Sequence, residues 1–268
     1  MNKDKDFEQV ERIKDYWESP DTISIIDNNL HSLEIEYVSQ YLESSDIAID
    51  IGCGDGKATV EYARKVNKIL GIERSDNLRS KAEKAAANSG LKNISLKSGD
   101  VMNLKNYKES FDVAVTQRML INLSSWEDQM VALDNILNLL KPNGRYIMVE
   151  NTNDSFGALN SLRSEVNLKK IPLHWHNLFF DYNQLMEFLK QRFEIIGHHD
   201  FGLYYLLTRV YVQMFSSFEG YGKKAKKDDV FEVADKAAKE LHKVLNDRIK
   251  FDDTRSLGPI QVFALRKK

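Results

Sequence analysis

Residues 47 to 56 read Ile47-Ala48-Ile49-Asp50-Ile51-Gly52-Cys53-Gly54-Asp55-Gly56, an apolar run that breaks into three glycines at alternate positions. The apolar part is rich in β-branched residues and too short for a helix, so it predicts a buried strand. The residues from Lys57 to Ala63 then predict the start of a helix. A strand, a glycine turn and a helix form the first unit of a nucleotide-binding α/β fold, because only a backbone without Cβ turns this tightly beside a ligand.

The residues around the glycines separate two kinds of nucleotide site. A dinucleotide-binding turn has its third glycine where this chain has Lys57. The acidic Asp50 at the end of the strand would repel a pyrophosphate but suits a ligand that carries an amino group. The turn therefore favours a cationic nucleoside and argues against a nicotinamide oxidoreductase. A glycine turn that binds no ligand is the alternative.

The composition predicts one globular protein of ordinary size. The chain has 268 residues, of which 42% are hydrophobic, and a formal net charge of −2. This balance lacks the basic footprint of a nucleic-acid-binding protein, and the lysine-rich run at residues 223–227 is followed by two aspartates. Neither a signal-peptide pattern nor an apolar run long enough to span a membrane is present, so we expect a cytoplasmic protein. The single Cys53 excludes an intrachain disulfide.

The order of predicted strands and helices divides the chain into three parts. Residues 1–45 form a helical segment that is expected to cover the cofactor cleft, with Tyr16 and Trp17 as candidates to line it. Residues 46–150 alternate regularly between strands and helices and form the cofactor-binding core. Residues 151–268 supply the remaining strands and two insertions, 151–180 and 203–256, that we expect to bind the second substrate.

Acidic residues follow the second and third predicted strands. Glu73 lies about twenty residues beyond the glycines, where nucleotide-binding folds place the carboxylate that accepts hydrogen bonds from the ribose hydroxyls. Asp100 follows the third strand and suits the exocyclic amine of adenine, with Val101 or Met102 against the ring. The alternatives to these ligand contacts are that Glu73 lies on the surface and that Asp100 only caps a turn.

These residues, together with Leu140-Lys141-Pro142-Asn143-Gly144, resemble the class I S-adenosylmethionine-dependent methyltransferases. The resemblance implies an α/β fold with a Rossmann-like seven-stranded sheet, helices on both faces and helical insertions, in which the last strand runs antiparallel beside the sixth. It implies S-adenosyl-L-methionine as the cofactor. It assigns to the cofactor Asp50, Gly52, Gly54, Glu73, Arg74, Asp100, Val101, Met102 and Gln117.

A narrower likeness lies in three places: the run from Arg118 to Leu123 with Trp126 and Gln129, then Leu159-Asn160 with Leu162-Arg163, and then Trp175-His176-Asn177. These stretches are similar to methyltransferases of bacterial surface and capsular polysaccharide pathways, some of which act on sugar hydroxyls and some on phosphate-type groups. This likeness implies O-methylation of a small sugar, nucleotide-linked or phosphate-type precursor. An N-methyltransferase of another small metabolite is one alternative, and a regulatory module that binds the cofactor without catalysis is another.

Candidate catalytic residues lie in and after the fifth predicted strand. A general base is needed only where the acceptor carries a proton, and histidine suits proton transfer near neutrality. We predict His176 and Glu150 as catalytic residues. Since a guanidinium fork matches an anionic group, we predict acceptor contacts from Arg118, Arg163, His174 and Asn177. The alternatives are that the histidines only pack in the protein and that the arginines form surface ion pairs. His174 and His176 would share one face of an extended chain, but without a third ligand nearby we predict no metal site.

Overall fold

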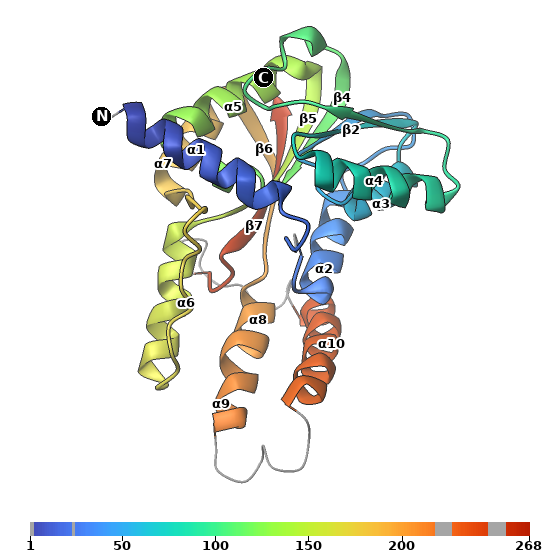
Figure 1. Cartoon of the computed structure of the whole chain (residues 1–268). Coiled ribbons are helices and arrows are strands. Elements are labelled where there is room, and N and C mark those ends of the chain that lie inside the picture. The colour runs from blue at the N-terminus through green and yellow to red at the C-terminus, as the bar shows by residue number, and fades with distance from the viewer. Residues whose placement is uncertain (1–2, 23–24, 218–226, 246–255) are drawn as a thin grey trace.

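The computed structural model describes residues 3–22, 25–217, 227–245 and 256–268. Its centre is a seven-stranded sheet with the strand order β3-β2-β1-β4-β5-β7-β6 (Figure 1). Strand β7 is antiparallel to both of its neighbours, whereas the other neighbouring strands are parallel. This arrangement confirms the predicted fold. The strands are β1 (Ile47–Ile51), β2 (Lys68–Glu73), β3 (Ile94–Ser98), β4 (Phe111–Gln117), β5 (Leu140–Asn151), β6 (Phe193–Asp200) and β7 (Ile260–Lys267).

Helices cover both faces of this sheet, so its central strands are buried on both sides. Along β1, Ile49 and Ile51 belong to one apolar core, whereas Ala48 belongs to the other. The first core includes α5 (Trp126–Leu139) and α7 (Tyr182–Arg192). The second core includes residues of α2 (Asn28–Ser39), α3 (Lys57–Ala63), α8 (Gly202–Tyr205) and α10 (Lys227–Leu245).

Both long insertions leave the sheet at the carboxyl ends of its parallel strands. The first follows β5 and contains α6 (Asn153–Glu165). The second connects β6 to the reversed strand β7, and it contains α8, a π-helix at Leu206–Tyr211, α9 (Val212–Ser217) and α10. In Figure 1 these helices extend downward, away from the sheet. Ligands of open α/β sheets bind at this same edge, so the insertions stand beside the expected cleft.

The segment 1–45, expected to be helical, contains two helices, α1 (Lys3–Glu18) and α2, which ends at Ser39. The N–H of Gln40 donates to the carbonyls of Tyr37 and Val38 and closes this last turn. Residues 218–226, which hold most of the lysine-rich run, lie outside the described residues. No helix within the described ranges is long and apolar enough to cross a membrane.

Two glycines provide a matched test of the turn that precedes α3. Gly56 (φ +78°) and Gly90 (φ +71°) both have left-handed backbones, but a Cβ on Gly56 would lie 2.8 Å from the Cα of Ala82, whereas a Cβ on Gly90 would meet nothing within 4 Å. We expect Gly90→Ala to lower the free energy of unfolding by about 1 kcal/mol, the cost of a left-handed non-glycine residue. Gly56→Ala should lower it by about 3 kcal/mol because overpacking adds to that cost. Urea unfolding measures both, and equal losses would contradict the close approach of α3 to α4 (Asp76–Ser89).

Candidate cofactor and acceptor site

A cavity of about 780 Å³ lies at the carboxyl ends of β1, β2 and β4. Its volume falls within the range of roughly 300–1,000 Å³ that is typical of small-molecule sites. The glycine turn, α1, α2, the segment 171–179 and the helices of the second insertion all contribute lining residues. One cavity therefore joins the predicted cofactor region to the predicted acceptor region.

The glycine turn leaves one side open to this cavity. Gly54 lines the cavity with φ +56°, and a Cβ built on it would meet nothing within 4 Å. Gly52 has φ +72°, and a Cβ there would lie 2.3 Å from the Cγ of Met119. The two positions need glycine for different reasons: Gly52 for packing, and Gly54 for a backbone that a ligand can approach.

Asp50 lies at the end of β1, and its side chain is buried among apolar strands. Its carboxylate accepts a hydrogen bond of 2.6 Å from the hydroxyl of Thr59. Burial raises the pKa of Asp50 to about 7. A cationic amino group that enters the cavity would restore the ionised form, so Asp50 fits the amino end of S-adenosylmethionine.

Glu73 ends β2 on the opposite side of the glycine turn. Its carboxylate accepts hydrogen bonds from the backbone N–H groups of Gly54, at 2.9 Å, and Ser75, at 2.8 Å. Burial raises the pKa of Glu73, although these donors favour the ionised form. Each oxygen keeps a further lone pair, so the carboxylate retains capacity for the ribose hydroxyls.

The residues predicted to bind adenine follow β3 and only partly line the cavity. Asp100 forms an ion pair of 3.7 Å with Arg74, and both line the cavity with the buried Val101. Met102 does not: its backbone N–H donates to the Asp100 carboxylate and its side chain packs against the first apolar core. The structure therefore brings Arg74, Asp100 and Val101 together at the cavity and leaves Met102 outside its lining.

Gln117, at the end of β4, belongs to a chain of polar side chains. Its amide nitrogen donates to the buried carboxylate of Glu34 at 3.0 Å, and its amide oxygen accepts from the Tyr62 hydroxyl at 2.8 Å. Arg118 lies 3.5 Å from the same Glu34 carboxylate and has a left-handed backbone, with φ +50°. Strained backbones of this kind cluster at functional sites, and both Gln117 and Arg118 line the cavity.

Glu150, predicted as catalytic, lies next to the cavity but does not line it. Its fully buried carboxylate accepts hydrogen bonds from the backbone N–H groups of Met119, Leu120 and Ile121, at 2.9–3.4 Å. Burial raises its pKa to about 8. With three donors on the carboxylate, the geometry favours an orienting role, in which Glu150 holds the loop after Arg118, over the role of a base.

The predicted acceptor loop brings His174, His176 and Asn177 to the cavity. The ring of His176 is buried and stacks on Tyr16 of α1, with ring centroids 4.5 Å apart. Burial lowers the pKa of His176, which keeps the ring neutral near pH 7. Its Nδ1 has no hydrogen-bond partner among the described residues. Within that part of the chain, no third metal-ligating side chain joins the two histidines.

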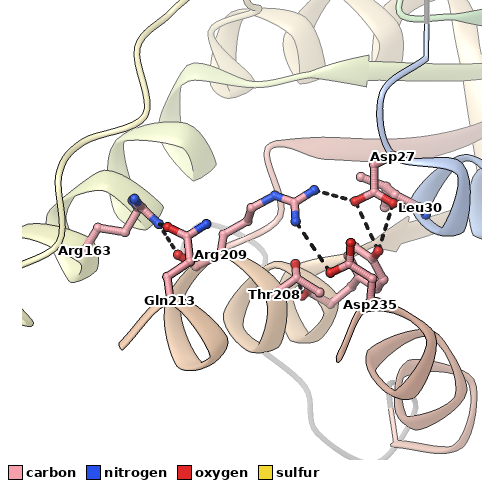
Figure 2. Close-up of polar contacts among 8 residues, drawn as sticks. Asp27, Leu30, Arg163, Thr208, Arg209, Gln213 and Asp235 are labelled. Atoms are coloured by element: carbon pink, nitrogen blue, oxygen red, sulfur yellow. Dashed lines mark hydrogen bonds and ion pairs between the residues drawn. The ribbon is translucent and has the colours of Figure 1, made fainter. Parts of the chain in front are cut away.

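Arg163 is the predicted acceptor contact that the structure does not bring to the cavity. Its guanidinium donates to the backbone carbonyl of Lys169. It also donates to the backbone carbonyl of Arg209 and to the side chain of Gln213 (Figure 2). These acceptors occupy all three nitrogens. Arg163 therefore connects α6 to the π-helix. All of its nitrogens donate to protein groups, so none is left to contact an acceptor.

Helix α1 lies over one side of the cavity, as the sequence led us to expect. Tyr16 and Trp17 line the cavity, and the Trp17 indole N–H donates to Asn122 at 3.3 Å. The Glu18 carboxylate accepts hydrogen bonds from the backbone N–H groups of Asp76 and Asn77, at 2.9 and 3.2 Å, and so caps the first turn of α4.

Sequence reasoning missed several polar residues that line the same cavity. Asn151 directly follows Glu150 at the end of β5, so the strand-end rule could have found it. The others lie far apart in the sequence and carry no local motif: Asp27, His31, Thr208, Arg209, Gln213 and Asp235.

Comparison with known proteins identifies the family. A family described as a methyltransferase domain matches residues 42–218. The chain is 28% identical over 136 residues to an uncharacterized methyltransferase of Schizosaccharomyces pombe, covering 48% of this chain and 44% of that protein. It is 30% identical over 134 residues to a probable cobalt-precorrin-6B C(15)-methyltransferase of Methanothermobacter thermautotrophicus, covering 48% of this chain and 67% of that protein. It is 31% identical over 113 residues to a demethylmenaquinone methyltransferase of Lactobacillus johnsonii, covering 41% of this chain and 45% of that protein.

Solved structures share the fold at low sequence identity. A geranyl diphosphate methyltransferase in complex with SAM aligns with a TM-score of 0.56 at 12% identity, covering 89% of this chain and 86% of that one. The [4+2]-cyclase SpnF aligns with a TM-score of 0.55 at 20% identity, covering 87% and 80%.

The chain belongs to the methyltransferase-domain family. This membership confirms the resemblance to S-adenosylmethionine-dependent methyltransferases, and with it the expectation of an enzyme that uses this cofactor. The open side of Gly54 and the two carboxylates at the ends of β1 and β2 fit such a ligand. The chain spans less than half the length of the first and third relatives, so the family match identifies the class and leaves the acceptor open.

Binding of the cofactor product should depend on pH through Asp50. The pKa of about 7 leaves this carboxyl neutral at pH 6 and ionised at pH 8. S-adenosylhomocysteine carries the same cationic amino group as the cofactor, so its affinity should be about tenfold weaker at pH 6 than at pH 8. Calorimetric titration at the two pH values measures this ratio. Asp50→Asn should bind weakly at both, and an unchanged ratio in this variant would contradict the assignment.

Proposed function

We propose that the chain transfers the methyl group of S-adenosylmethionine to a small molecule held in the cavity. The observation that carries this proposal is the open glycine turn at Gly54, flanked by the buried carboxylates of Asp50 and Glu73 in a methyltransferase-family sheet. When bound, the cofactor supplies a methyl group on a sulfonium. Asp50, Glu73 and Gln117 would hold its amino and ribose groups, and Asp100 with Val101 its adenine.

The chain's own contribution to the chemistry is positioning and proton removal. Methyl transfer gains much of its rate from holding the reacting atoms close together. An acceptor hydroxyl must also lose its proton, and His176 is the side chain suited to accept it, because it lines the cavity as a neutral ring with an unpaired Nδ1. Tyr16 and Trp17 of helix α1 line this side of the cavity with aromatic rings.

We further propose a sugar-type hydroxyl as the acceptor, in a precursor of a surface polysaccharide. The support is the polar lining beside His174, His176 and Asn177, together with the sequence likeness of this loop to such enzymes. The relatives named above act, by their names, on other small molecules such as a cobalt-precorrin and demethylmenaquinone. A phosphate-type acceptor would need no general base, because its oxygen carries no proton at neutral pH. An amine acceptor would need a different base or none.

A cofactor-binding protein without methyl transfer is the second candidate. The [4+2]-cyclase SpnF shares this fold. The two candidates agree on cofactor binding and differ in whether a methylated product forms.

Cofactor binding tests the first half of the proposal. S-adenosylhomocysteine should bind in calorimetric titration with an affinity in the micromolar range. Asp50→Ala and Glu73→Ala should each weaken binding by about tenfold or more, since each removes a charge-assisted hydrogen bond. Lys170→Ala, an exposed change in the acceptor loop, should leave the affinity unchanged. No binding to the unaltered protein at high micromolar concentration would overturn the proposal.

Product formation tests the second half. Incubation with methyl-labelled S-adenosylmethionine and a protein-free metabolite extract should give a labelled small molecule. With that product in hand, His176→Gln should lower kcat by about 100-fold or more if His176 is the general base. The kcat of the unaltered enzyme should fall below neutral pH, where the lowered pKa of His176 is crossed. A kcat within about twofold of the unaltered enzyme would contradict the role of His176, and absence of any labelled product would favour the cofactor-binding module.

A further inference from the structure

One wall of the cavity is built from five polar residues that lie before α2, on the π-helix, on α9 and on α10. We call it the polar wall; its members are Asp27, Thr208, Arg209, Gln213 and Asp235. Figure 2 shows the guanidinium of Arg209 between the carboxylates of Asp27 and Asp235. Arg209 comes from the π-helix, Asp27 precedes α2 and Asp235 lies on α10. None of these residues belongs to the cofactor region described above.

Asp27 is fully engaged by protein groups. Its carboxylate caps α2 by accepting from the N–H of Leu30 at 2.9 Å, and it accepts from the Tyr204 hydroxyl at 3.0 and 3.1 Å. It also accepts a hydrogen bond from Arg209. Asp27 therefore fixes the position of the guanidinium and has little capacity left for a ligand.

Asp235 differs from Asp27 because its carboxylate accepts no hydrogen bond from the described residues. Its one partner among the described residues is Arg209, whose Nη1 lies 3.9 Å from the carboxylate, beyond hydrogen-bond distance. The side chain keeps about a fifth of its surface exposed and lines the cavity. A half-buried carboxylate that accepts no hydrogen bond from the protein is free to accept one from a ligand.

A second residue of the cavity also has a side-chain oxygen that accepts no hydrogen bond from the described ranges. Asn151 is more than nine-tenths buried and lines the cavity, and its side-chain oxygen has no hydrogen bond within the part of the chain that the structure describes. Buried polar atoms are paired in nearly all native structures, so an unpaired one in a cavity points to a ligand.

The charge of the cavity disfavours an anion. Each arginine that lines it pairs with a carboxylate: Arg74 with Asp100, Arg118 with Glu34 and Arg209 with Asp27. At the polar wall itself, the two carboxylates of Asp27 and Asp235 face the single guanidinium of Arg209. A phosphate or carboxylate group would meet surplus negative charge and would bring no hydrogen-bond donors.

We propose that the polar wall is the acceptor-recognition site, and that it binds a small molecule through hydroxyl or ammonium donors, with Asp235 as the carboxylate that accepts from them. The inference rests on the proposed function, which it narrows from sugar, nucleotide-linked and phosphate-type acceptors to those that present donors and no anionic group to this wall. Arg163 supports the site from outside, since it holds the backbone carbonyl of Arg209.

A charge series on one scaffold tests this proposal. D-Glucosamine, D-glucose and D-glucose 6-phosphate are titrated against the full chain saturated with S-adenosylhomocysteine, with binding followed by ligand-observed NMR. We expect both donor-bearing hexoses to bind at least about tenfold more tightly than the phosphate. A preference for glucosamine would identify the donor as ammonium, and equal binding of glucosamine and glucose would identify it as hydroxyl.

Asp235→Asn should lower the affinity for both donor-bearing hexoses by about fivefold or more. It should also reduce the ratio of their affinities to that of glucose 6-phosphate. Glu232→Gln is the matched control, because it removes one charge from the exposed surface of the same helix. Both variants should bind S-adenosylhomocysteine as the unaltered protein does, which also reports that they are folded. The proposal is overturned by tighter binding of glucose 6-phosphate, by an Asp235→Asn variant that binds the hexoses unchanged, or by no binding of either donor-bearing hexose. Loss of S-adenosylhomocysteine binding by the unaltered protein would instead contradict the proposed function.

Discussion

Strand β7 runs opposite to β5 and β6, and this reversal determines where the rest of the molecule can lie. A chain that leaves β6 at the carboxyl edge of the sheet must enter β7 from the same edge. The connection between them, with α8, the π-helix and α10, therefore stays beside the cofactor turn. The connection after β5 leaves from that edge as well. The strand directions therefore bring the glycine turn and both insertions to one cavity.

The carboxylates in and beside this cavity differ in how many hydrogen bonds they accept from protein groups. Glu150 accepts three backbone N–H groups, and Asp27 is saturated by a helix N-terminus, a tyrosine and an arginine. Both hold protein in place. Asp50 and Asp235 have few partners, and the desolvation of a carboxylate is offset best by a donor from outside. The number of protein donors on each carboxylate thus separates structural from ligand-binding roles.

The sheet and the cofactor turn could be predicted because their signals are local. The β-branched run before Gly52 and the acidic residue that ends β2 each need only a few neighbouring residues to be recognised. The acceptor side could not be predicted in this way. Arg163 reads as a free cation in the sequence, yet its acceptors are carbonyls and an amide that folding brings to it. Asp235 lies on a charged helix with no motif, and only the packing of α10 against the π-helix places it at the cavity.

The ion cluster of Asp27, Arg209 and Asp235 has a consequence for how such enzymes diverge and how they can be engineered. Its three members come from the N-terminal segment, the π-helix and α10, so none of these segments carries the cluster alone. A chimera that exchanges only the second insertion with a relative would leave Asp27 without its arginine, and an uncompensated buried charge is strongly destabilising. Acceptor preference in this scaffold is therefore inherited as a linked set of segments, and recombination has to transfer them together.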